Sequence, residues 1–227
     1  WLGICFAIFG ALAAFGIGNM IQSNTTAYAL SETLGASKFL VGVTLALLTS
    51  MVIIGGIKRI ADVASYFVPI MVAIYFIGAL VVIFKNLSHL ASGITLIVEH
   101  AFSGTAATGG FVGATLAQTI RYGVARGLFS NESGMGSAPI AAAAAKTNHP
   151  AKQALVSMTG TFLDTLVVCS LTALALSSTG VWVSGETGVA LTIQAFSAGL
   201  PGIWGNVIVT LGVTTFAFSS ILAWEYY

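Results

Sequence analysis

The stretch Gly127-Leu-Phe-Ser-Asn-Glu-Ser-Gly-Met-Gly-Ser137 decides how this chain folds, because its polar groups interrupt a long region of apolar sequence. It places a carboxylate, an amide, three hydroxyls and three glycines where the surrounding residues favour a membrane-spanning helix. In a bilayer core, irregular backbone is tolerated only where it is buried in protein or lines a wet cavity. An ionisable residue at that depth, here Glu132, indicates a functional site. We therefore predict a helix that is broken in order to bind something small and charged.

The composition of the chain predicts an all-α, polytopic membrane protein. Of its 227 residues, 57% are hydrophobic and 7% are charged, whereas an ordinary soluble domain has about 25% charged residues. The apolar runs are about 20 residues long, which suits helices better than the roughly ten-residue strands of a membrane barrel. A net charge of +1 offers no basic surface to nucleic acid. Cys5 and Cys169 lie in apolar runs, so we interpret both as small hydrophobic residues and expect neither a disulfide nor a metal site.

About six membrane-spanning helices are expected, one of them broken. They cover residues 2–21 (continuing toward 34), 39–57, 63–84, about 112–146, 153–177 and about 202 to the end. In addition, 87–102 has the pattern of an amphipathic helix in the membrane interface, and 189–198 suits a short re-entrant helix. No linker divides residues 1–227, which we treat as a single transmembrane domain. Both ends of the chain look cut, so we expect earlier and later helices to be missing.

The break is expected to join the end of one half-helix to the start of another. Gly127 follows a helix-compatible stretch and is predicted to close the first half-helix, with Gly134 and Gly136 in the irregular part. Ser137 is predicted to cap the second half-helix. Ten residues from Ser137 to Lys146 would span about 15 Å, or half of the hydrocarbon core.

Such paired helix ends favour a ligand that carries both charges. The carbonyl-rich end offers partial negative charge to a cation, and the amide-rich start offers partial positive charge to a carboxylate. The same arrangement recurs at the substrate sites of secondary transporters, so the break predicts an amino acid as ligand. Small residues also let membrane helices pack closely, but the Asn131-Glu132 pair favours a site. Glu132 itself is left with three roles: substrate ligand, proton carrier, or structural partner of Arg126.

Further polar and aromatic residues within the spans are candidates for the site. Gln22 can donate and accept hydrogen bonds, which suits either a zwitterion or a neighbouring helix. Asp164 either holds a coupling ion or, as we prefer, links structurally to the broken helix. Ser219 and Ser220 suit sodium, although helical serines usually bond back to their own helix. Trp224 either walls a small apolar pocket or belongs to the interfacial aromatic belt.

The residues of the break resemble a known family signature. The stretch 127–140, followed by an alanine run and Lys-Thr-Asn-His-Pro150, resembles the signature of the alanine or glycine:cation symporter family. Supporting stretches are Phe15-Gly-Ile-Gly-Asn-Met-Ile-Gln22, Gly55-Gly-Ile-Lys-Arg59, Ile120-Arg-Tyr-Gly-Val-Ala-Arg126, Asp164-Thr165 and Phe216-Ala-Phe-Ser-Ser-Ile221. The resemblance covers essentially the whole chain.

The resemblance implies the leucine-transporter-type inverted-repeat fold of the amino acid–polyamine–cation superfamily, with these residues as its third through eighth spans. It also implies a set of substrate contacts, namely Gln22, Phe129, Ser130, Asn131, Glu132 and Trp224. Sodium would bind near Ser219 and Ser220 together with a helix outside this chain. The sequence departs from the family pattern at Ser133, Ala142, Ser220, Ala223 and Glu225, so ion affinity and ion choice are the parts of the resemblance with least support.

We therefore expect a secondary active symporter in the cell membrane that couples inward sodium movement to uptake of alanine or glycine. It would not be an enzyme, and it would need no cofactor besides the co-transported sodium. One alternative is an intramembrane serine hydrolase that uses Ser137 with His149 as base, which is disfavoured because His149 lies beyond Lys146 in a basic loop. The other is an ion channel, which would favour a continuous polar face that the second and third spans lack.

Overall fold

A computed structural model of the protein describes residues 1–102, 121, 123–125, 127, 130–132 and 134–226. All regular structure among these residues is helical. The chain forms two compact units. Unit 1 comprises Trp1–Gly78 and Glu186–Tyr227, and unit 2 comprises Ala79–Gly185.

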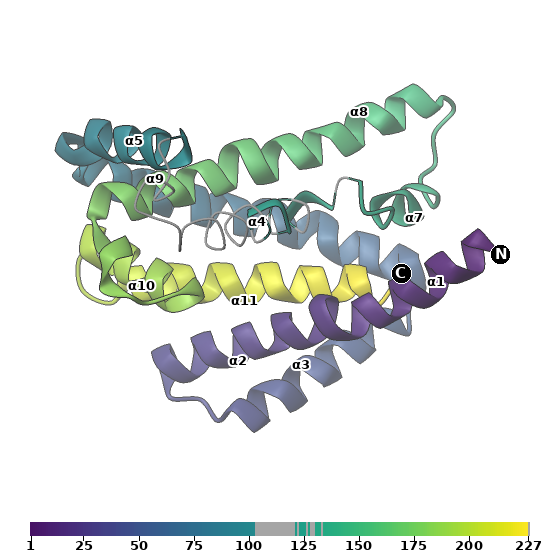
Figure 1. Ribbon diagram of the computed structural model, residues 1–227. Helices are drawn as coiled ribbons and strands as arrows, with labels where there is room; N and C mark the ends of the chain where they lie inside the picture. Colours follow the sequence, from purple (N-terminus) through teal and green to yellow (C-terminus); the bar gives the residue numbers. More distant parts are fainter. Residues whose placement is uncertain (103–120, 122, 126, 128–129, 133, 227) are drawn as a thin grey trace, which may run out of the picture. The chain divides into compact units, whose positions relative to one another are not determined.

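Four helices in the described part of the chain are long and apolar enough to cross a membrane. Two of them are composite, because each contains a short π-helical segment, labelled η1 or η3, within an otherwise α-helical run. The four are Leu2–Leu34 (α1 Leu2–Ala13, η1 Ala14–Met20, α2 Ile21–Leu34), Gly56–Lys85 (α4), Pro150–Thr179 (α8 Pro150–Thr161, η3 Phe162–Cys169, α9 Ser170–Thr179) and Trp204–Trp224 (α11) (Figure 1). In the described part of the chain, these helices are consistent with the expected all-α, polytopic membrane protein.

Two of the six expected spans remain predictions. The helix α3 (Lys38–Ile53), at the position of the expected span 39–57, is 16 residues long. At 1.5 Å per residue it extends about 24 Å, less than the roughly 30 Å of a hydrocarbon core. The expected broken span begins within residues 103–120, which lie outside the described part of the chain.

The boundary between α3 and α4 differs from the expected one. We expected the second span to end at Lys58-Arg59 and the third to begin at 63, but α3 ends at Ile53 and α4 begins at Gly56. Gly56 has a φ of +69°, a left-handed conformation that glycine adopts at little cost. The Gly55-Gly56 pair therefore makes the turn, and the two charged residues lie in the first turns of α4.

Two shorter helices are confirmed where the sequence predicted them. The helix α5 (Leu87–Phe102) covers the amphipathic stretch, and α10 (Gly188–Gly199) covers the stretch expected to be re-entrant. Between α9 and α10 lies a short 3₁₀ turn, η4 (Val181–Ser184), followed by Gly185 with a φ of +82°. The position of α5 and α10 in a membrane stays a prediction.

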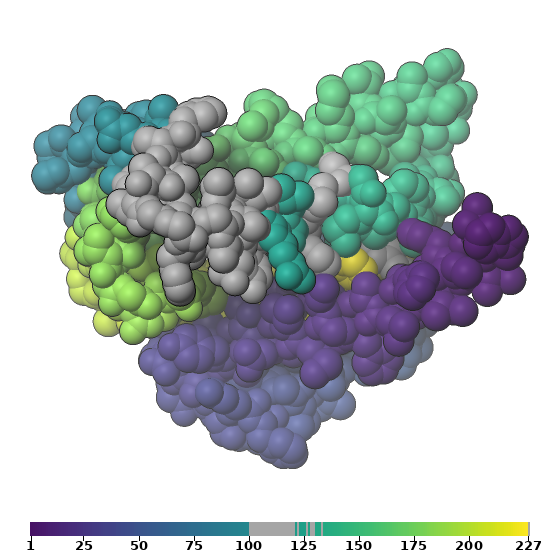
Figure 2. Space-filling view, in the orientation of Figure 1, coloured from purple at the N-terminus to yellow at the C-terminus, as the bar shows by residue number. Residues whose placement is uncertain are grey.

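Apolar side chains on the first helix point outward. Trp1, Leu2, Phe9 and Phe15 are all exposed, and in Figure 2 the purple α1 forms part of the visible surface. Soluble proteins rarely expose contiguous apolar surface of this kind. This exposure is consistent with a membrane protein, in which apolar side chains on the outside of a helix are at no disadvantage.

Unit 1 is organised around α11, which packs against α2, α3 and α10 (Figure 1). Thr33 on α2 and Thr210 on α11 share a hydrogen bond with an Oγ1–Oγ1 distance of 2.6 Å. The ring of Tyr75 on α4 lies 5.3 Å from that of Phe196 on α10 and 5.9 Å from that of Phe216 on α11, centroid to centroid. Aromatic packing thus joins three helices of the unit.

Unit 2 is organised around the long helix α8–η3–α9. The helix α5 packs against α9, and the crossing is close, because a Cβ added to Gly93 would lie 2.9 Å from the Oγ of Ser177. Small residues at such crossings let membrane helices approach each other. Gly180, with a φ of +72°, ends α9. The broken region 121–142 belongs to this unit.

Candidate functional site

The interruption of the helix is observed, and it begins at Glu132. Ser130 and Asn131 have helical backbone, Glu132 has a φ of +56°, and regular helix resumes only with α7 (Ala138–Ala142). Among the described residues, Glu132 is the single non-glycine residue with a positive φ. For such a residue the left-handed conformation costs roughly 1–2 kcal/mol, and strain of this kind is concentrated at binding and active sites.

The expected role of Gly127 as the residue that closes the first half-helix is wrong. Gly127 has helical backbone, and the left-handed turn is made by Glu132 together with Gly134 and Gly136, whose φ values are +85° and +90°. Helical backbone is therefore found beyond the first glycine, at Ser130 and Asn131. Phe129 lies outside the described residues.

Ser137 does not cap the second half-helix through its side chain. It stands at the N-cap position of α7 without a side-chain cap bond, and its Oγ instead donates to Oε2 of Glu132 at 2.7 Å. Ser137 is buried and Glu132 is half-buried. The hydroxyl therefore helps to fix the carboxylate of the strained residue.

The second half-helix is also shorter than the ten residues that we expected. Helix α7 has five residues, and the chain is irregular from Ala145 to His149. His149 is extended and precedes Pro150, the first residue of α8. A residue before proline is sterically restricted to extended backbone, so helix cannot run continuously from α7 into α8.

Two hydrogen bonds link the end of the first half-helix to η3. The Oγ of Ser130 donates to Oδ2 of Asp164 in a short bond, and Nδ2 of Asn131 donates to Oγ1 of Thr165 at 2.7 Å. Asp164 thus makes the structural link to the broken helix that we preferred over a coupling-ion site.

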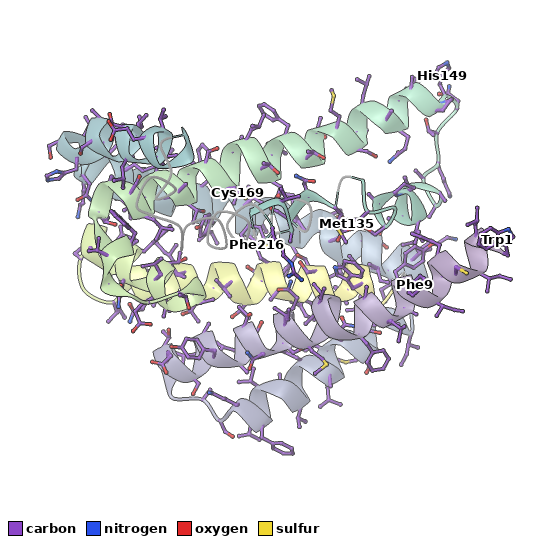
Figure 3. The ribbon with its side chains drawn as sticks, viewed as in Figure 1. Trp1, Phe9, Met135, His149, Cys169 and Phe216 are labelled. Carbon is purple, nitrogen blue, oxygen red and sulfur yellow. The ribbon has the colours of Figure 1, made fainter. Side chains whose placement is uncertain are left out.

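We expected no contact with the broken helix from Thr165 or Cys169, yet both residues make one. Besides Thr165, which bonds Asn131, the Sγ of Cys169 lies 3.4 Å from the Oγ of Ser130. Because the single proton of that hydroxyl goes to Asp164, the thiol is the donor in this contact. Figure 3 shows Cys169 on the long α8–η3–α9 helix and Met135 on the irregular stretch before α7. The Asp164-Thr165 dipeptide was the one available signal for the first of these contacts.

The residues proposed for a serine hydrolase have other partners. The hydroxyl of Ser137 donates to Glu132, whereas Nδ1 of His149 accepts a hydrogen bond from the backbone N–H of Ala151 at 3.2 Å. His149 therefore caps α8, at whose start Figure 3 shows it. Arg126, the suggested partner of Glu132, lies outside the described residues.

In unit 1, Trp224 is buried and lines an open hollow of about 590 Å³. The hollow is lined by Ala11, Ala14, Phe15, Asn19, Met20, Ser23, Trp224 and Glu225. Nδ2 of Asn19 donates to Oε1 of Glu225 at 2.9 Å. Trp224 is 6% exposed, so it packs inside unit 1, and its depth in the membrane stays a prediction. Gln22 is half-buried in the first turn of α2, between two lining residues of the hollow, Asn19 and Ser23.

The two serines proposed for sodium lie on α11, about one turn before Trp224. The Oγ of Ser219 donates to the carbonyl oxygen of Phe216 at 2.8 Å, which is the bond back to the helix that such serines usually make. Both serines are half-buried. A hydroxyl that donates in this way keeps its oxygen lone pairs for a cation, so the geometry of Ser219 is compatible with a sodium site.

Comparison with known proteins gives relatives along the whole chain. The sodium/alanine symporter AgcS of Methanococcus maripaludis is 46% identical over 230 residues, which cover 100% of this chain and 49% of the relative. An uncharacterised transporter of Haemophilus influenzae is 47% identical over 229 residues, covering 100% and 50%. The probable sodium/glutamine symporter GlnT of Bacillus subtilis is 39% identical over 228 residues, covering 100% and 47%.

The chain spans about half the length of the curated relatives that it matches. The family described as the sodium:alanine symporter family matches residues 1–227. Its members are transporters and not enzymes, which excludes the hydrolase alternative, and the apolar helices agree with a multi-pass membrane protein. The resemblance drawn from the broken helix is thereby confirmed: the chain belongs to the sodium:alanine symporter family.

Proposed function

We propose that this chain forms part of a secondary active symporter that couples inward sodium movement to the uptake of a small neutral amino acid, alanine or glycine. The observation that carries the proposal is the broken helix at Glu132, which lies in a chain that matches the sodium:alanine symporter family along its full length. A break between two helix ends suits the carboxylate and the ammonium of one amino acid. No covalent chemistry is required.

The substrate would meet mainly the backbone at the break. The side chains of Ser130 and Asn131 already bond to η3, so these two residues would offer their carbonyl oxygens, while Glu132 would add charge. On the resemblance of the sequence to the family signature, we propose further contacts from Gln22, Phe129 and Trp224. The bulk of Trp224 would limit the size of the substrate side chain.

Sodium would bind near Ser219 and Ser220 and favour the state that admits substrate from outside. We further propose that the chain contributes six spans to a leucine-transporter-type inverted-repeat fold. In such folds one helical bundle rocks against the other to expose a central site on alternate sides of the membrane. The four span-length helices and the polar break are in keeping with this arrangement.

Glutamine is the second candidate substrate, because one relative is named as a probable sodium/glutamine symporter. A larger amide substrate would need more room beside Trp224 than alanine does. The two candidates differ in side-chain length, so competition between them separates the two hypotheses directly.

Uptake into liposomes by the full-length protein tests the proposal. We expect labelled alanine to accumulate when an inward sodium gradient is imposed, and to stop accumulating when potassium replaces sodium or an ionophore dissipates the gradient. Excess unlabelled glycine should compete and excess glutamine should not. Uptake that is indifferent to the sodium gradient contradicts the coupling, and competition by glutamine alone would favour the second substrate.

A further inference from the structure

Gly18, in the π-helical segment η1, lies directly against Trp224 at the end of α11. A Cβ added to Gly18 would come within 2.7 Å of both Cβ and Cδ2 of Trp224, and closer still to its Cγ. Gly18 is buried, as is Trp224. The contact therefore exists only because residue 18 has no side chain.

Rotation of the tryptophan side chain would not make room for a larger residue. Rotation about the Cα–Cβ bond moves the ring but leaves Cβ in place, and Cβ of Trp224 is one of the three close atoms. A methyl group at position 18 would therefore push η1 and the end of α11 apart. Packed interiors resist such insertions and shift backbone to accommodate them.

The requirement for glycine is specific to this position in η1. Gly16 lies two residues earlier in the same segment, and a Cβ added there would meet nothing within 4 Å. The π-helical backbone itself thus does not demand glycine. What demands it at position 18 is the neighbouring tryptophan.

A second contact holds the same two segments together one residue further along each of them. Asn19 follows Gly18, Glu225 follows Trp224, and their side chains share the hydrogen bond described above. Both Asn19 and Trp224 line the hollow of unit 1. The separation of η1 from α11, and with it the width of that hollow, therefore depends on the Gly18 contact.

We infer that Gly18 is a positioning residue that sets the size of the substrate side chain, by seating Trp224 against η1. The inference rests on the proposed function, in which Trp224 contacts the amino acid. A wider gap would leave a methyl side chain poorly packed and would admit a longer one.

Binding of two amino acids by the full-length protein tests the inference, with Gly18→Ala as the variant and Gly16→Ala as its matched control. Both substitutions add one methyl group and the same gain in helix propensity, so they differ in the tryptophan contact alone. We expect Gly18→Ala to favour the binding of methionine over that of alanine, so that the ratio of their two dissociation constants changes by about tenfold. That figure is the lower end of the effect that one methylene group has on discrimination by an apolar pocket. Gly16→Ala should leave the ratio unchanged, because its new methyl group meets nothing.

A general loss of stability would weaken the binding of both ligands and leave the ratio as it was. An unchanged ratio in Gly18→Ala overturns the inference but leaves the proposed function intact. If wild-type protein binds no neutral amino acid at all, the proposed function fails first.

A double variant covers the case in which Gly18→Ala does not fold. Trp224→Gly removes all three close atoms. The fall in melting temperature caused by Gly18→Ala should therefore be smaller in the Trp224→Gly background than in the wild-type protein. An equal fall in both backgrounds contradicts the seating of Trp224 by Gly18.

Discussion

The two π-helical segments of this protein are held in place in opposite ways. In unit 1, η1 lies against α11 because Gly18 lacks a side chain and Trp224 fills the space. In unit 2, η3 is bound to the broken helix by polar side chains, chiefly those of Asp164 and Thr165. Both segments interrupt long, apolar, membrane-length helices, where π turns often mark functional sites.

The difference shows how a membrane protein can hold irregular backbone in two environments. Where the neighbouring element is a regular helix, close packing suffices, and small residues provide it. Where the neighbouring element is itself broken, its polar groups must be satisfied inside the protein, since the bilayer offers no water. Serine and asparagine at the end of the first half-helix meet that need through η3.

The largest expected effects fall on two of the residues that we propose as substrate ligands. Gln22→Ala and Glu132→Ala should each raise the dissociation constant for alanine by at least about tenfold, equivalent to about 1.4 kcal/mol, because in the proposal each removes a group that bonds the zwitterion. Isothermal titration of the full-length protein measures both. If both variants bind alanine normally, the site is wrongly assigned.

Glu132→Gly serves as the control that separates the carboxylate from the strained backbone. Glycine adopts the φ of +56° without strain, so this variant should be about 1 kcal/mol more stable than Glu132→Ala. It should nevertheless bind alanine as weakly as Glu132→Ala does. Normal binding by Glu132→Gly would instead assign the role to the backbone at this position.

An intermediate effect is expected where the polar link of unit 2 is cut. Asp164→Ala removes the acceptor of the Ser130 hydroxyl and should lower the free energy of unfolding by about 0.6–1.7 kcal/mol, between the average and the largest energy measured for hydrogen bonds between membrane helices. Asp164→Asn keeps an acceptor oxygen and should retain most of the stability. Thermal unfolding of the full-length variants in detergent measures the difference.

Transport by the same two variants tests whether the charge of Asp164 is also used. A structural link predicts that Asp164→Asn transports alanine nearly as well as wild type. If Asp164→Asn is stable but inactive, the carboxylate has a second role, and the coupling-ion alternative is correct.

The smallest effect is expected at the polar contact of unit 1. Asn19→Ala removes the exposed hydrogen bond to Glu225, but it also removes Oδ1 of Asn19, a buried acceptor with no partner among the described residues. The loss of the hydrogen bond and the removal of the unsatisfied acceptor have opposite effects on stability and nearly cancel. The free energy of unfolding should therefore change by less than about 0.5 kcal/mol. A larger fall in the melting temperature would show that unit 1 depends on polar contacts as unit 2 does.

Much of the fold followed from the sequence because hydrophobicity and helix period are local properties. The long apolar runs, the helices at 87–102 and 189–198 and the break before Ser137 were all predictable from spacing and composition. The errors fell at boundaries. Gly127 and Lys58-Arg59 looked like helix ends, whereas the chain turns at Glu132 and at Gly55-Gly56. A glycine or a pair of charged residues is compatible with helix as well as with a turn, so neither pattern by itself fixes where a helix ends.

The amino-acid sequence was enough to predict a membrane protein of the symporter family with a polar break in an apolar helix, because lipid allows few other interpretations of such residues. The groups that bond the broken helix, and the residue that packs against Trp224, became apparent only from the folded structure. Ser130 meets Asp164 across 34 positions, and Gly18 meets Trp224 across almost the whole chain. Such contacts depend on how helices cross and on the extra residue that a π turn inserts, and neither feature produces a periodic pattern in the sequence.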